Sequence, residues 1–243
     1  KWHNTPVADT VPGGPKHNWP AQRGFDTFYG FMAGETHHFF PSRLMLNNTL
    51  LPVDTYPPSY YSGDDWMDQG IKYVKELRAS RPTKPFFLYV SNNAMHSPLH
   101  AKHEDIERYR GHYARGWNAT RAERFDRQQA MGLVPIGTTL PQSDPRAPLW
   151  EDTDPRNRTT YARHMEVYAA MLDNADQNVG KLLRCLDELG ERENTIIVFT
   201  SDNGGTDAGG EHGVFNHNRM YAGLPPRAIE EERALASLLG SPQ

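Results

Sequence analysis

Asp202 and Asn203 are adjacent oxygen donors that follow a short apolar segment, 196–199. That segment, Ile-Ile-Val-Phe, is typical of a strand buried on both faces of a parallel sheet. Ligands of open α/β sheets bind beyond the carboxyl ends of the strands. Carboxylate and amide oxygens suit hard cations such as Ca²⁺ or Mg²⁺. The pattern therefore indicates a cation site, with Gly204 and Gly205 turning the backbone; the alternative is an ordinary Asp-Asn-Gly-Gly turn.

A second apolar segment, 86–90, ends in the same way. Its sequence, Phe-Phe-Leu-Tyr-Val, predicts another buried strand, and the polar stretch after it contains His96. A histidine at the same edge of the sheet could act as an acid or a base. His100 and His103 follow at spacings compatible with zinc. Pro98 interrupts any helix that would align the three histidines, which disfavours a zinc site.

Long helices must position these strand ends. In residues 158–189 apolar side chains recur every three or four positions, which predicts a helix that Gly190 ends. A helix leading directly into the strand at 196–199 is half of a repeating α/β unit. Residues 62–77 predict a second helix, with Ser62 as its cap. The chain is therefore expected to be an α/β protein, with a mostly parallel sheet and helices on both faces.

The remaining segments are less regular. Residues 102–157 are expected to form an excursion rich in loops and short helices, because prolines interrupt its second half. Residues 47–53 predict an edge strand, and residues 228–239 predict a short amphipathic helix. The sequence begins at Lys1 without an initiator Met, and we expect both ends to be truncated.

Composition narrows the classes of function. A net charge of -4 and an isoelectric point near 6.3 give no reason to expect nucleic acid as a partner. The mean hydropathy is -0.74, and no run of about 18 apolar residues suggests a membrane span. Cys185 is the only cysteine, so no internal disulfide forms, and it is expected to pack inside the predicted helix. The oligomeric state and the compartment, cytoplasmic or periplasmic and secreted, stay open.

Four motifs occur in order along the chain. They are K-W-H at 1–3, R-G-F-D-T-F-Y-G-F at 23–31, A-M-H-S-P-L at 94–99 and T-S-D-N-G-G at 200–205. This ordered set resembles the sulfatase family of the alkaline phosphatase superfamily. The stretch M-E-V-Y-A-A-M at 165–171 is similar to the bacterial arylsulfatase branch. The resemblance spans almost the full chain and implies that residues 1–243 are the central part of a sulfatase catalytic domain.

The resemblance implies a hydrolase that acts on small-molecule sulfate esters. Family members hold Ca²⁺, or sometimes Mg²⁺, with ligands that include an Asp-Asn pair, which here would be Asp202 and Asn203. Lys1 would contact the sulfate or the nucleophile. His3 would act as the base that expels sulfate, and His96 would contact the sulfate or assist the leaving oxygen.

The sequence also departs from the family pattern. Sulfatases use a formylglycine made from the Cys or Ser of a C-x-P-S-R motif upstream of K-W-H, and that motif is not in this chain. Residues 39–43 match only its tail, with Phe in place of Cys and on the wrong side of K-W-H. The early acidic metal ligands and the downstream sulfate-binding lysine are missing too. We therefore expect this chain alone to be inactive. The alternatives are a phosphate or phosphonate ester hydrolase of the same superfamily and a non-catalytic relative that binds a ligand.

Overall fold

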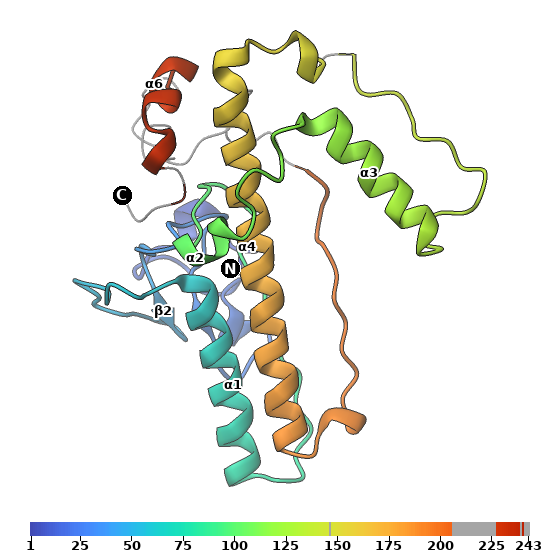
Figure 1. Ribbon diagram of the computed structural model, residues 1–243. Coiled ribbons are helices and arrows are strands. Elements are labelled where there is room, and N and C mark those ends of the chain that lie inside the picture. Colours follow the sequence, from blue (N-terminus) through green and yellow to red (C-terminus); the bar gives the residue numbers. More distant parts are fainter. Residues whose placement is uncertain (146, 206–226, 239, 241–243) are drawn as a thin grey trace.

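The computed structural model describes residues 1–145, 147–205, 227–238 and 240 (Figure 1). The strands are β1 (Tyr29–Gly30), β2 (Met45–Leu46) and β3 (Thr49–Leu50). The α-helices are α1 (Ser62–Ser80), α2 (His103–Glu107), α3 (Gly116–Ala130), α4 (Pro155–Glu188) and α6 (Ile229–Ala234). The 3₁₀ helices are η1 (Val7–Asp9), η2 (Pro20–Gln22), η3 (Trp150–Asp152), η4 (Arg192–Asn194) and η5 (Ala236–Leu238).

The helix predicted over 158–189 is confirmed as α4, which begins three residues earlier. The Asp154 side chain caps it by accepting a hydrogen bond of 2.9 Å from the backbone N–H of Arg156. Pro155 occupies the first helical position, where its missing N–H costs nothing. Gly190, with a φ of 69°, follows the last turn. Local sequence signals alone therefore define both ends of this helix.

The second predicted helix is confirmed as α1, but the expected cap is wrong. Tyr61 occupies the capping position and Ser62 is the first helical residue. The backbone N–H of Ser62 donates to the carbonyl of His38 at 2.8 Å, so tertiary contact replaces a side-chain cap. Helices α1 and α4 pack against each other and run in the same direction (Figure 1). Cys185 is buried in α4, as expected for a packing residue.

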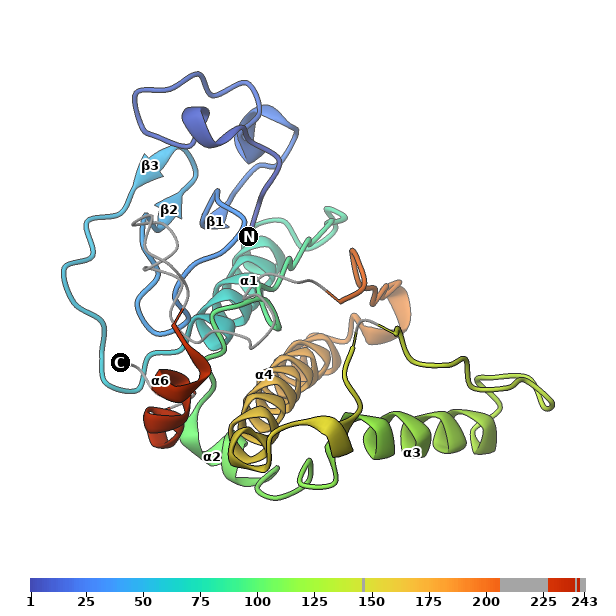
Figure 2. The same ribbon diagram turned by 90° about the horizontal axis from the view of Figure 1, so that it is seen from above.

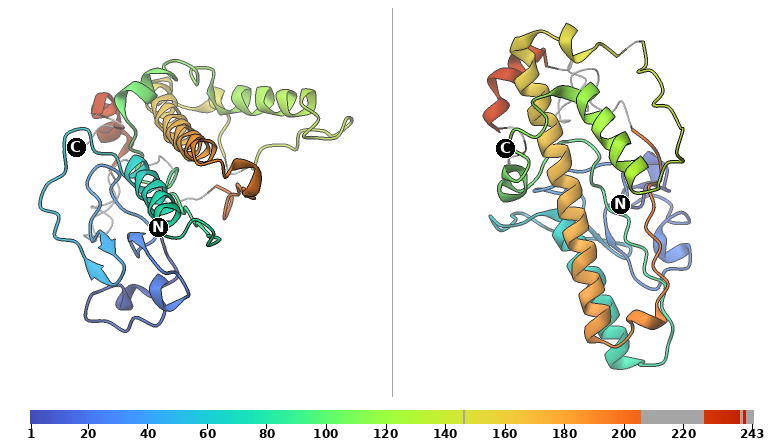
Figure 3. Two further views of the ribbon diagram at one scale, coloured as in Figure 1. Left: turned by 90° about the horizontal axis from the view of Figure 1, so that it is seen from below. Right: turned by 45° about the vertical axis from the view of Figure 1, so that its right-hand side comes forward.

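The two segments predicted as buried strands, 86–90 and 196–199, are extended but unpaired, and much of their apolar surface is exposed. Phe87 is 80% exposed and Ile196 is 93% exposed. Each segment returns along the molecule after its helix, α1 or α4 (Figures 1 and 3). A strand of a parallel sheet is buried only when neighbouring strands and covering helices flank it. Those neighbours are not among the described residues, so the two segments lie exposed and form no parallel sheet here.

The sheet that the described residues form is small and antiparallel, with the order β1-β2-β3. The edge strand predicted at 47–53 is present only as the two residues of β3. Two apolar clusters flank this sheet, and the second joins it to α1 through Trp66. One consists of Trp19, Met32 and Met45, and the other of Phe31, Leu44 and Trp66. Helices with a small sheet are what an incomplete α/β domain would show.

The excursion predicted at 102–157 contains α2 and α3. Helix α3 projects away from the α1 and α4 pair, as Figure 2 shows from above.

The helix predicted over 228–239 is shorter than expected. Helix α6 ends at Ala234 and η5 follows, while residue 239 lies outside the described residues. None of the helices in the described part of the chain has the length and apolar character needed to cross a membrane.

Candidate functional site

Residues 1–3 run beside the segment that follows β1. The backbone N–H of Trp2 donates to the carbonyl of Phe31 at 3.0 Å, and that of His3 donates to the carbonyl of Met32 at 3.1 Å. The backbone nitrogen of Lys1 donates to the carbonyl of Ser91 at 3.0 Å. Three separate parts of the chain, including the polar stretch that leads to His96, therefore meet at residues 1–3.

Gly34 lies directly against the ring of His3. A Cβ atom at this position would be 2.8 Å from Nε2 of His3, closer than real Cβ contacts come. The ring can keep its place only because residue 34 has no side chain. His3 itself is exposed, so its ring is open to solvent on the side away from the loop.

His96 is held through both its ring and its backbone. Ring atom Nδ1 lies 2.8 Å from the carbonyl oxygen of Ser97 and 3.4 Å from Oε2 of Glu35. The backbone N–H donates to the carbonyl of Asn93 at 2.9 Å. Because both ring partners are hydrogen-bond acceptors, Nδ1 must carry the hydrogen. The neutral ring then has Nε2 as its proton acceptor.

His38 supports this arrangement from within the protein. Its Nε2 lies 3.4 Å from the carbonyl oxygen of His96, and its Nδ1 lies 3.4 Å from Nδ2 of Asn93. Oδ1 of Asn93 accepts a hydrogen bond of 2.9 Å from Nε1 of Trp66. Burial lowers the pKa of His38 to about 4, so the ring is neutral at pH 7. A neutral ring that donates from Nε2 and accepts at Nδ1 satisfies both neighbours.

The sequence singled out His3 and His96, and the loop at 31–35 contacts both of them. Gly34, Glu35 and His38 were not among the predicted site residues, because they lie outside the four motifs. A weak signal was present: a glycine followed by an acidic residue and two histidines, in a loop next to an aromatic-rich segment. Nothing local in such a stretch shows which side chains it will meet.

Asp202 and Asn203 lie elsewhere, at the end of the exposed segment that follows η4. Both are exposed. The Asn203 side chain donates to the carbonyl of Gly204 at 2.6 Å, and the hydroxyl of Ser201 donates to the carbonyl of Asn203 at 2.6 Å. Among the described residues, no hydrogen bond or ion pair joins this pair to His3 or His96.

The pair does not form a complete cation site with the other described residues. Ca²⁺ takes 6 to 8 oxygen ligands, and Asp202 and Asn203 offer one carboxylate and one amide. Within the ranges that the structure describes, no group of three or more His, Cys, Asp or Glu side chains is arranged to hold a metal ion. The donor types suit Ca²⁺ or Mg²⁺, but the set is too small to bind either ion by itself.

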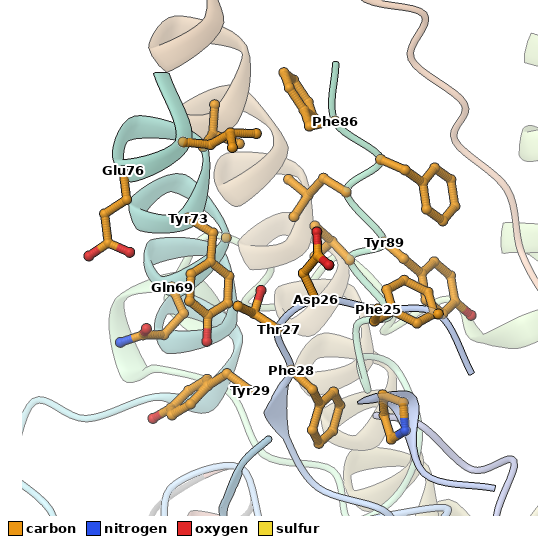
Figure 4. A pocket seen from close by; sticks show the side chains of 18 of the residues that line it. Phe25, Asp26, Thr27, Phe28, Tyr29, Gln69, Tyr73, Glu76, Phe86 and Tyr89 are labelled. Carbon is orange, nitrogen blue, oxygen red and sulfur yellow. The ribbon is translucent and has the colours of Figure 1, made fainter. Parts of the chain in front are cut away.

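A long groove of about 870 Å³ opens next to residues 1–3. Figure 4 shows Gln69, Tyr73 and Glu76 of α1 on one side of it and Phe86 and Tyr89 on the other. Aromatic side chains line it together with charged ones, among them Lys1, Asp26 and Lys84. His3 and His96 are not among the residues that line this groove, whereas Lys1 is.

Two histidines held by one loop have side chains that can take up and release protons. The sequence profile of the Sulfatase family matches residues 1–224. The chain therefore belongs to the sulfatase family, and the ordered motifs of the sequence are confirmed at the level of the family.

Individual relatives agree with this assignment. The chain is 32% identical over 220 residues to an arylsulfatase of Klebsiella aerogenes, and the match covers 86% of this chain and 44% of that protein. It is 30% identical over 217 residues to an uncharacterized sulfatase of Schizosaccharomyces pombe, covering 84% of this chain and 37% of that protein. The chain thus spans less than half the length of these curated relatives.

A solved structure gives a weaker match. The crystal structure of Ps i-CgsB superposes with a TM-score of 0.43 and 21% identity, covering 74% of this chain and 32% of that one. This superposition adds nothing to the assignment, which rests on the family profile and the sequence relatives.

Proposed function

We propose that the protein hydrolyses sulfate esters, as an arylsulfatase-type enzyme that acts on small molecules. The observation that supports this most is the loop at 31–35, which contacts His3 and His96 in a chain whose residues 1–224 match the Sulfatase family. The activity belongs to the protein made from the complete coding sequence, since the chain covers 44% of the arylsulfatase it resembles.

In this proposal each site residue has a role that suits its chemistry. His3 is the base that takes a proton as sulfate is expelled, and its exposed ring is accessible for this step. His96 contacts the sulfate or assists the leaving oxygen through Nε2, the ring atom that its neighbours leave open. Lys1 places a positive charge beside the transferring group, which stabilises the negative charge that develops there.

A divalent cation and a formylglycine belong to the same proposal. When present, the cation neutralises negative charge and the formylglycine supplies the nucleophile. The described residues do not complete a site for the cation. We propose Asp202 and Asn203 as two of its ligands and Ca²⁺ as the ion, with Mg²⁺ as the alternative, and we expect other segments to provide the remaining oxygen ligands.

Calorimetry of the protein made from the complete coding sequence tests the metal ligands. We expect the Asp202→Ala variant to lose Ca²⁺ binding, because one of few carboxylate ligands is removed. The matched control is Asp126→Ala, which removes an exposed carboxylate of α3. Unchanged Ca²⁺ binding by Asp202→Ala would rule out this residue as a ligand.

The sequence alternatives are decided by comparing turnover of an aryl sulfate with that of an aryl phosphate by the same protein. We expect faster turnover of the sulfate. Faster turnover of the phosphate would favour a phosphate ester hydrolase, and turnover of neither would favour a non-catalytic relative. Residues 1–243 alone are expected to turn over neither ester, since no match to the nucleophile motif occurs in them. Sulfate turnover by that chain would contradict our account of the nucleophile.

We also propose that the extended segments at 86–90 and 196–199 are strands of a parallel sheet in the complete domain. Each follows a long helix and returns past it, as strands of α/β units do (Figure 1). Their exposed apolar side chains are those of strands without neighbours. In such a sheet, the ends that carry His96 and Asp202 would lie at one edge.

A further inference from the structure

We propose that Glu35 is a positioning residue for His96, fixing the ring so that Nε2 faces the sulfate ester. This inference rests on the proposed function, because it assigns a task to His96 in ester hydrolysis. It concerns a residue outside the four sequence motifs that carry the family resemblance.

The carboxylate of Glu35 lies next to the ring of His96. Oε2 of Glu35 lies 3.4 Å from Nδ1 of His96, and the Glu35 side chain is only 9% exposed. An ionised carboxylate accepts hydrogen bonds and cannot donate them. It therefore selects the ring form that has its hydrogen on Nδ1. The carbonyl of Ser97, 2.8 Å from the same atom, selects the same form.

The backbone on both sides of this contact is fixed. The N–H of His96 is bonded to the carbonyl of Asn93, and the carbonyl of His96 faces Nε2 of His38. With the main chain held in this way, the remaining freedom of His96 is rotation of its side chain. A carboxylate next to Nδ1 limits that rotation, which is how a partner group orients a catalytic histidine.

The position of Glu35 also couples the two histidines. Its neighbour Gly34 lies against the ring of His3, so one dipeptide contacts both candidate groups. The His96 side chain is 28% exposed, more than that of Glu35. The ring can therefore be reached from outside while its carboxylate partner is shielded. A carboxylate buried behind an accessible histidine suits positioning better than substrate contact.

The kinetic experiment uses the protein made from the complete coding sequence. We expect Glu35→Gln to lower kcat/KM for an aryl sulfate by about 10-fold to 100-fold, mainly through kcat, as loss of an orienting partner does. In a His96→Ala background the same change should cause no further loss, because residues that act as one unit are not additive. The control is Glu193→Gln, which alters an exposed carboxylate next to no candidate group.

Equal losses in both backgrounds would overturn the proposal, because Glu35 would then act independently of His96. An unchanged rate in Glu35→Gln would overturn it as well. A loss that appears in KM alone would make Glu35 a substrate contact, which also contradicts a positioning role.

A spectroscopic measurement on residues 1–243 separates this inference from the proposed function, because it needs no activity. Nitrogen-15 NMR of the His96 ring should show the hydrogen on Nδ1, and the Nδ1 signal should shift in Glu35→Gln but not in Glu193→Gln. An unshifted signal would refute the contact itself. A shifted signal in residues 1–243, together with no sulfate turnover by the protein made from the complete coding sequence, would refute the proposed function while the contact stands.

Discussion

His38 is a buried histidine whose ring stacks on Tyr61 and supports the backbone of His96. Desolvation is the largest influence on it, and it lowers the pKa to about 4 from an ordinary value of 6.5. In the unfolded chain the ring binds a proton below pH 6.5, whereas in the folded protein it does so only near pH 4. Between these values the unfolded state binds more protons, so the free energy of unfolding falls as the pH falls.

This linkage gives a prediction for stability. Above pH 6.5 the titration of His38 does not reduce the free energy of unfolding. As the pH falls to 4, it should lower that free energy by on the order of 3 kcal/mol. Chemical denaturation of residues 1–243 at a series of pH values measures it. The His38→Gln variant keeps a polar side chain but does not titrate, so its stability should depend less on pH over this range. Identical pH dependence in both proteins would contradict the neutral, buried state of His38.

At the scale of residues, the sequence could predict side chains that belong to recognisable motifs. Lys1, His3 and His96 were singled out in this way, although their roles remain proposals. Glu35 and His38 could not be predicted, because their importance comes from contacts with residues some sixty positions away, which no local pattern encodes.

At the scale of elements, the contact between α1 and α4 centres on one half-buried carboxylate. Oδ1 of Asp64 accepts hydrogen bonds from Asn174 at 3.1 Å and Asn178 at 2.9 Å, both in α4. Oδ2 accepts one from Lys102 at 3.0 Å. Burial alone would raise the pKa of Asp64, but these hydrogen bonds outweigh it and lower the pKa below its usual value. Asp64 lies in the first turn of α1, and no local pattern in the sequence reveals its contacts with α4.

Removing the charge of Asp64 should weaken the packing of α1 against α4. We expect Asp64→Asn to lower the free energy of unfolding by about 2–3 kcal/mol, because it replaces hydrogen bonds to a charged group and leaves Lys102 without its partner. The matched control is Asp68→Asn, whose carboxylate is 64% exposed and 3.8 Å from Lys181. It should cost less than about 1 kcal/mol. Equal effects in urea denaturation would show that Asp64 does not link the helices.

The elements also show what a single sequence can and cannot specify. Helix α4 was predictable because its cap, its apolar period and its terminal glycine are all local features. The segments at 86–90 and 196–199 are exposed among the described residues because burial of a strand depends on neighbours. Their composition is typical of core strands, but composition does not show which neighbouring strands would cover them.

At the scale of the whole molecule, apolar surface remains uncovered beside α1 and α4. Phe87, Val198 and Phe199 are each about four-fifths exposed. The groove of about 870 Å³ lies between α1 and the segment that contains Phe87 (Figure 4). Soluble monomers rarely leave large contiguous apolar patches open, and unpaired extended segments invite association. Because the chain spans 44% of a relative, covering strands from a longer protein would account for this surface.

This surface predicts the behaviour of residues 1–243 in solution. We expect them to bind a hydrophobic dye and to self-associate as concentration rises, since exposed apolar groups favour both. Replacing Phe87 with Ser should reduce dye fluorescence without lowering the free energy of unfolding. The control is Ile136→Ser, which changes a residue that is 98% exposed but lies in the excursion near α3. If Ile136→Ser reduces dye binding and Phe87→Ser leaves it unchanged, the apolar surface that binds the dye does not include Phe87.

The central claim is that the loop-held histidines serve sulfate ester hydrolysis. The most direct test is the rate of aryl sulfate hydrolysis by the protein made from the complete coding sequence, measured for the wild type, His96→Ala and His103→Ala. Our account predicts a loss of about 100-fold or more for His96→Ala, because general acid or base assistance is removed. It predicts a wild-type rate for His103→Ala, whose side chain is 80% exposed on α2. A wild-type rate for His96→Ala would contradict the account.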